Sequence, residues 1–311
     1  MEKNRLLAYL AMIVTVAIWG IAGPVIKITL RDIQPFALLA LRFLVSAVVI
    51  SPILCLYLKK NPDQVPRSFS EVGQLILLTL LGTTTTLTLV FLGIARTTAL
   101  DASLIIATAP LFIILGGSVV CIKGVVCLRE KVTRLEKLGL AIALTGVGAT
   151  VLQPLLEGGI FAGGNLAGNL LVLASNISWT AFTLLTKEAF KRFSPLLVTA
   201  TSFIFGFFTF LPLALIENPN LPSALIRIPP SAWTGILYMS LLSSIVAYFA
   251  YAWAVSKIEA SEAAVFAYLE PIFSVPFAYL WLGEVPTAAF LIGAIIIAAG
   301  VVISEYQPRR E

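Results

Sequence analysis

Ten apolar runs of about 20 residues follow one another along this chain of 311 residues. A helix of that length crosses the roughly 30 Å hydrocarbon core of a bilayer. Charged residues make up 12% of the chain, against roughly 25% in an ordinary soluble domain. The sequence therefore predicts an all-α integral membrane protein with ten transmembrane helices. The expected spans are 6–29, 35–57, 72–95, 99–122, 134–152, 166–187, 196–216, 232–255, 260–282 and 287–304.

The basic residues are distributed unevenly between the two sides of these spans. Sixteen of the 21 Lys and Arg residues lie on the side that holds the N-terminus, and Arg42 lies within the second span. The other side holds Lys27, Arg31, Arg96 and Arg227. Positive charge in short loops stays in the cytoplasm. We therefore expect a protein of the cell membrane with both termini cytoplasmic, and we attribute the net charge of +5 to topology rather than to nucleic-acid binding.

The two halves of the sequence repeat one another. Residues 17–35, AIWGIAGPVIKITLRDIQP, are matched 160 positions later by residues 177–195, ISWTAFTLLTKEAFKRFSP. Each half has five spans, an odd number, so the second copy enters the bilayer from the opposite side. Inverted repeats are common in secondary transporters, because two related halves can open a central site alternately to either side. We predict two inverted five-helix repeats, residues 1–154 and 155–311.

Four segments carry a resemblance to a known family: AIWGIAGPVIK, ALLALRFLVSA, EPIFSVPFAYLWLGE and FLIGAIIIAAGVVI. In this order and spacing they resemble the EamA-type proteins of the drug/metabolite transporter superfamily, over roughly residues 6 to 304. The resemblance implies a central cavity between two five-helix repeats and secondary transport of small metabolites, often export of amino acids or related compounds. The chain departs from the family where Arg129 precedes Glu130 in place of the usual glycine.

Hydroxyl and aromatic side chains at mid-membrane depth are the first candidates for substrate contacts. In the eighth span Ser244, Tyr248 and Tyr251 follow the i, i+4, i+7 spacing that puts them on one helical face. The related stripe in the third span is Thr84, Thr88 and Phe91. The two stripes could line opposite sides of one cavity, or they could serve helix packing.

The repeated first helix supplies further candidates. Trp19 and Trp179 occupy matching positions, and we add Tyr268 from the ninth span. Asn176 carries an amide that needs partners inside a membrane, so it could bind substrate or a neighbouring helix. The matching lysines at positions 27 and 187 are expected to anchor helix ends at the interface, with a substrate or gating role as the alternative.

Charged residues within or beside the spans have a choice of roles. Glu270 precedes Pro271, and an acid inside a span is a candidate for proton coupling. The structural alternative is that it caps backbone groups freed by the proline or pairs with Arg42. Arg42 is expected to tie helices together rather than to bind substrate. Glu130 and Glu284 lie at span ends, where capping or pairing with basic neighbours is expected.

Several chemistries have no support in the sequence. There is no GxxxxGK[ST] phosphate loop and no histidine, which argues against ATP hydrolysis and removes the commonest metal ligand. Clustered catalytic groups are also missing, so we expect neither an enzyme nor a cofactor.

We predict a secondary transporter of a small neutral or amphipathic metabolite, with amino-acid export as the first choice and protons as the candidate coupling ion. Sugars, nucleotide derivatives and phosphates are the alternative substrates. Anions would need several Lys or Arg at mid-depth, and only Arg42 qualifies. A membrane protein without a transport cycle is the other alternative.

Overall fold

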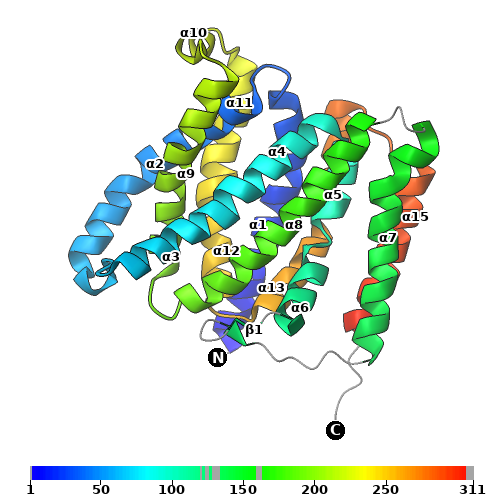
Figure 1. Cartoon of the computed structure of the whole chain (residues 1–311), viewed down its shortest axis with the longest axis horizontal. Helices are drawn as coiled ribbons and strands as arrows, with labels where there is room; N and C mark the ends of the chain where they lie inside the picture. Colours follow the sequence, from blue (N-terminus) through cyan, green and yellow to red (C-terminus); the bar gives the residue numbers. More distant parts are fainter. Residues whose placement is uncertain (1, 120, 123–125, 128–133, 159–162, 306–311) are drawn as a thin grey trace.

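The computed structural model describes residues 2–119, 121–122, 126–127, 134–158 and 163–305. It is a bundle of helices (Figure 1). The first half consists of α1 (Glu2–Thr29), α2 (Pro35–Lys60), η1 (Pro62–Gln64), α3 (Phe69–Thr79), η2 (Leu80–Thr85), α4 (Thr86–Arg96), α5 (Ala99–Ile106), α6 (Ala109–Val119) and α7 (Arg134–Gly158). Between α6 and α7, β1 (Cys121–Ile122) pairs antiparallel with β2 (Val126–Cys127).

The second half repeats this order of helices and interruptions. It consists of α8 (Gly163–Ala189), α9 (Pro195–Glu217), α10 (Leu221–Ile226), α11 (Pro230–Leu237), η4 (Tyr238–Val246), α12 (Ala247–Val255), α13 (Ala260–Val265), η5 (Phe266–Leu269), α14 (Glu270–Phe277), η6 (Ala278–Leu282) and α15 (Ala288–Glu305). The segments η2, η4 and η6 are π-helical, and η1 and η5 are 3-10 turns.

The apolar helices agree with the expected spans. In the described part of the chain, eight helices are long and apolar enough to cross a membrane. Two shorter apolar helices, Phe266–Leu282 and Ala288–Ile303, occupy the positions of the ninth and tenth spans. The prediction of an all-α membrane protein is confirmed. Several helices extend a few residues beyond the expected spans: α1 begins at Glu2, α2 ends at Lys60, and α7 continues to Gly158.

Proline starts matching helices in the two halves. α2 begins at Pro35 and α9 at Pro195, 160 positions later. Proline suits the first turn because a backbone N–H has no intrahelical partner there. The hydroxyl of Ser194 also caps α9 by accepting a hydrogen bond from the Leu197 N–H at 3.2 Å. These local signals explain why the repeat preserves proline at this offset.

The halves pack reciprocally. α1 contacts α12 and α14 of the second half, and α8 contacts α4 and α6 of the first. α2 packs on α9, and α7 packs on α15. Such exchange of equivalent contacts is what a two-fold axis between related units produces.

The matching helices α1 and α8 run in opposite directions. Lys27, near the end of α1, donates to the Thr97 carbonyl, and the Thr97 hydroxyl bonds Asn169, near the start of α8. The start of α1 and the end of α8 both lie beside the connection between α12 and α13, through Arg5 and Lys187. Figure 1 shows the start of α1 and the end of α15 on the same, lower side of the view. The halves are therefore inverted copies.

Candidate functional site

Two interrupted helices meet at a central cavity between the halves. α5 ends at Ile106 and α6 begins at Ala109, while the 3-10 turn Phe266–Leu269 separates α13 from α14. The matching prolines Pro110 and Pro271 each occupy the first turn after an interruption. The residues before and after both interruptions line the cavity. Broken helices of this kind form midplane substrate sites in transporters.

Four aromatic rings form one wall of this cavity, and we call them the aromatic cluster: Trp19, Trp179, Tyr248 and Tyr251. The Trp19 ring lies 5.6 Å from Trp179, 5.2 Å from Tyr248 and 5.4 Å from Tyr251, between centroids. The Trp19 indole N–H donates to the Ser243 carbonyl at 3.1 Å, which fixes its ring. The cluster joins α1, α8 and α12 and offers ring faces and edges to a bound molecule.

Arg42 is held inside the protein by two hydroxyl groups. Its side chain is 2% exposed. Nε donates to Ser244 Oγ at 2.8 Å, and Nη2 donates to Ser243 Oγ at 3.3 Å. The guanidinium group also lies 5.4 Å from the Phe43 ring and 5.9 Å from the Phe91 ring, within cation–π range. These contacts tie α2 to η4 and α4 and leave the guanidinium group at the cavity wall.

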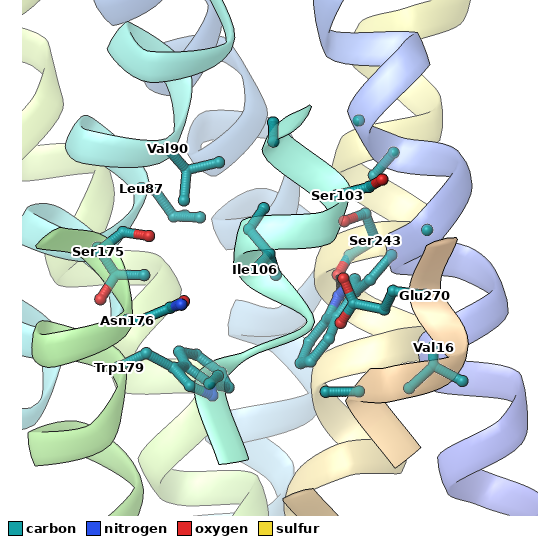
Figure 2. Close-up of a pocket in the computed structure, with 18 of the residues that line it drawn as sticks. Val16, Leu87, Val90, Ser103, Ile106, Ser175, Asn176, Trp179, Ser243 and Glu270 are labelled. Atoms are coloured by element: carbon teal, nitrogen blue, oxygen red, sulfur yellow. Dashed lines mark hydrogen bonds between the residues drawn. The ribbon is translucent and has the colours of Figure 1, made fainter. Parts of the chain in front are cut away.

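Glu270 faces the same cavity with its carboxylate unpaired. It is 7% exposed, and Figure 2 shows it across the cavity from Asn176 and Trp179. Within the described part of the chain, no hydrogen bond or ion pair reaches its carboxylate. The pairing with Arg42 that the sequence left open is therefore absent, and so is capping by this side chain. Glu270 and Arg42 are the charged residues among those that line the cavity.

Gly20 sets the position of Glu270. A Cβ atom at Gly20 would lie 2.6 Å from the Glu270 carbonyl oxygen and 2.9 Å from the Phe273 Cβ. Only glycine therefore lets α1 approach α14 this closely. This contact explains one of the glycines in the repeated motif and places the acid directly beside the helix that carries Trp19.

Asn176 bridges the interrupted helix of the first half. Its amide nitrogen donates to the Ile105 carbonyl at 2.8 Å and to Thr108 Oγ1 at 3.2 Å. The side chain is 2% exposed and also lines the cavity. The Ile105 carbonyl also accepts from the Thr108 N–H at 3.1 Å and the Thr108 hydroxyl at 2.6 Å, so the amide adds a link from α8 to a turn that is closed locally.

The remaining candidates occupy different places. Phe91 lines the cavity, whereas Thr84, Thr88, Ser244 and Tyr268 are not among the lining residues. Thr84 Oγ1 instead lies 2.9 Å from Thr209 Oγ1 of α9, and Ser244 supports Arg42. Whether any of the candidates binds a substrate stays a prediction.

Other lining residues had no place in the sequence-based set. Ser103, Ile106, Ser175 and Ser243 face the cavity, and Figure 2 shows them around it. The matching prolines that follow the two interruptions were the available signal for the residues of α5.

The glutamates at span ends have separate positions. Both carboxylate oxygens of Glu284 accept backbone hydrogen bonds at 3.1 Å, from Ala99 and Leu100. Glu284 thus caps the start of α5, where free N–H groups favour an acid. Glu130 and the adjoining Arg129 lie outside the described residues.

Known proteins are similar to this chain over nearly its full length. The profile of the EamA-like transporter family matches residues 6–152 and residues 166–306. A protein of Archaeoglobus fulgidus named "Uncharacterized transporter" is 30% identical over 296 residues, which cover 95% of this chain and 96% of that protein. A protein of Streptantibioticus cattleyicolor named "Probable terminal-alkyne amino-acid exporter" is 26% identical over 297 residues, 94% and 91% of the two chains.

A solved crystal structure supports the fold independently. It covers 100% of this chain with a TM-score of 0.66, at 16% identity and 99% of its own length. The family match extends over most of the sequence, and the relatives share nearly its full length. This chain belongs to the EamA-like transporter family.

Proposed function

We propose that this transporter is a secondary active carrier that exports amino acids or related neutral or amphipathic metabolites by alternating access. The observation that supports it is the central cavity, which combines one buried acid, one buried base and the aromatic cluster. A small solute with polar ends and an apolar body matches these walls. The relative named an amino-acid exporter is similar over most of its length and adds weight to this class.

Alternating access follows from the inverted packing. Equivalent helices of the two halves make equivalent contacts, so the halves can exchange conformations about a fixed central site. The interruptions in the fourth and ninth spans adjoin that site. The helical segment on one side of an interruption can therefore move while the segment on the other side keeps its helical hydrogen bonds.

Glu270 is our candidate for proton coupling. Its buried, unpaired carboxylate is the acid of the cavity, and protonatable groups within membranes commonly form proton relays. A proton gradient acting through this group would drive solute out of the cell. Sugars, nucleotide derivatives and phosphates remain the second choice. Anionic solutes would require several cationic side chains, and Arg42 supplies one.

Counterflow in liposomes tests this function. Purified protein is reconstituted, loaded with unlabelled leucine, phenylalanine, glucose, uridine or phosphate, and assayed for entry of the same labelled solute. We expect saturable exchange of the amino acids. Glu270→Gln, at saturating solute, should still exchange but lose its response to a pH gradient, whereas Glu259→Gln, an exposed acid away from the cavity, should keep it. A steady ion current, or no exchange of any class by folded protein, would contradict the proposal.

A further inference from the structure

The charges of the central cavity break the symmetry of the repeat. At the offset of 160, Arg42 corresponds to Ser202, and at the offset of 161, Glu270 corresponds to Ala109. Each charge therefore comes from one half alone, the base from the first and the acid from the second. The repeated fold does not require either of them, because the matching position in the other half is neutral. Arg42 also joins the two halves through Ser243 and Ser244, so a further role has to rest on the part of each charged group that such contacts leave unused.

Both charged residues line the cavity, and both have unused binding capacity. Within the described residues, the Glu270 carboxylate accepts no hydrogen bond. The Arg42 guanidinium uses Nε and Nη2 for the two serine hydroxyls, while Nη1 donates to no described residue. An arginine has five N–H donors and a carboxylate accepts up to about four hydrogen bonds. Buried charges without partners are costly, so a ligand with complementary charges would be stabilised at both.

The two charged residues are linked to one short stretch of α1. Ser243 connects Arg42 to Trp19, since its hydroxyl accepts from the guanidinium and its carbonyl accepts from the indole N–H. The next residue along α1, Gly20, packs against the backbone of Glu270. Arg42, Trp19 and Glu270 all line the same cavity, so a molecule beside the Trp19 ring has both the base and the acid among its neighbours.

We propose that this cavity recognises a zwitterion, with the substrate ammonium group on the Glu270 carboxylate and the substrate carboxylate on the Arg42 guanidinium. The apolar side chain of the substrate lies against the aromatic cluster. This inference rests on the proposed function and specifies it: the substrates are neutral amino acids with an apolar or aromatic side chain. Solutes with only one of the two charged groups leave the other protein charge unpaired, which a site of this kind disfavours strongly.

Thermal stabilisation of the purified protein in detergent tests recognition without requiring transport. The probes are L-phenylalanine, phenethylamine, which lacks the carboxylate, and 3-phenylpropionate, which lacks the ammonium group. We expect L-phenylalanine to bind at least about tenfold more tightly than either, the factor expected for one lost charge-assisted contact. The same three compounds then compete with labelled L-phenylalanine in counterflow.

Two substitutions assign the two ends of the molecule. Glu270→Gln should bring L-phenylalanine and 3-phenylpropionate to similar affinity while phenethylamine stays weak or weakens further. Arg42→Gln should bring L-phenylalanine and phenethylamine together. Glu259→Gln is the matched control and should leave all three affinities unchanged. If Arg42→Gln does not fold, Glu270→Gln still tests the ammonium end by itself. A structural role would lower all three affinities equally, so the ratios separate the two explanations.

The outcomes distinguish this inference from the proposed function. Equal binding of the three compounds by the unaltered protein, or no stabilisation by any of them, overturns the recognition of a zwitterion. Exchange of sugars or nucleosides in liposomes would then leave a transporter with another substrate. Selective binding of L-phenylalanine without exchange would support the recognition and overturn the transport cycle.

Discussion

Lys27 and Lys187, 160 positions apart, make similar contacts in the two halves: each donates to backbone carbonyl oxygen at or just beyond the end of the third span of its own half. Lys27 reaches the Ile94 carbonyl at 2.9 Å and the Thr97 carbonyl, and Lys187 reaches the Ile258 carbonyl at 2.6 Å. Carbonyl groups at a helix end lack intrahelical partners and carry partial negative charge. Neither lysine lines the cavity, so the contacts favour a structural role.

Removing one of these contacts should lower stability. We predict that Lys187→Met reduces the free energy of unfolding by about 1–2 kcal/mol, because it loses a charge-assisted hydrogen bond to the Ile258 carbonyl in the connection between α12 and α13. Lys191→Met is the control: that side chain is 73% exposed and pairs with Glu188 at 2.6 Å, an arrangement worth at most about 1 kcal/mol. Thermal unfolding in detergent measures both, and equal effects would contradict the prediction.

Two glycines of the same motif should respond differently to alanine. Gly20→Ala places a methyl group against the α14 backbone, 2.6 Å from the Glu270 carbonyl oxygen, and forces α1 and α14 apart. We predict a loss of about 1–3 kcal/mol in stability, as in other overpacked contacts. A Cβ at Gly23 lies 3.8 Å from Ser274 Oγ, an ordinary contact. Gly23→Ala should therefore stay within about 0.5 kcal/mol of the unaltered protein.

Much of the fold could be predicted from the sequence, since run length determines the spans and a constant offset reveals the repeat. The faces of the third and eighth spans could not. η2 and η4 are π-helical at matching positions. An i→i+5 turn contains one residue more than an α-helical turn, so the side chains before it are rotated around the helix axis relative to those after it. As a result Ser243 rather than Ser244 lines the cavity together with Tyr248 and Tyr251, and Thr84 turns to Thr209. No residue pattern in these spans signals a π-turn.

The partners of the charged residues were equally beyond sequence reasoning. The spacing of residues does not show that two serines hold Arg42, because these contacts join residues about 200 positions apart. It also does not show that the Glu270 carboxylate has no partner, because that depends on the positions of all the surrounding side chains. The sequence allows the Asn176 amide to bind either substrate or a neighbouring helix. Its partners lie at an interruption that the apolar pattern of the fourth span does not reveal.

Asn176 should contribute to the stability of that interruption. We predict that Asn176→Ala lowers the free energy of unfolding by about 1 kcal/mol, the usual scale for a hydrogen bond between membrane helices, and increases hydrogen exchange at the start of α6. Asn165→Ala changes an exposed amide of the same helix and should have little effect. A change of exchange confined to α8 would show that the bridge to Ile105 and Thr108 is unimportant.

Glu262 should control opening at one end of the bundle. Its carboxylate accepts from Arg5 Nε at 3.0 Å and from the Tyr9 hydroxyl, which joins the start of α1 to α13. At the repeat offsets the other half has Asn165, Asn169 and Asp101 in these positions, without a basic residue. In the proposed alternating-access cycle, α1 and α13 separate when this end opens, so we expect the ionic contact to stabilise the closed arrangement of that end.

We predict that Glu262→Gln shifts the population toward opening at this end by several-fold. The Arg5 side chain is 64% exposed and the Glu262 side chain 25%, so the ion pair is worth at most about 1 kcal/mol, enough to change a two-state ratio about fivefold. Spin labels at Leu6 and Glu259, both exposed, should show longer distances in the variant. High salt should produce part of the same shift in the unaltered protein. Glu188→Gln is the control: it breaks a surface ion pair with Lys191 at the end of α8 and should leave the distances unchanged. An identical shift in this variant would show that the Arg5 contact has no part in closure.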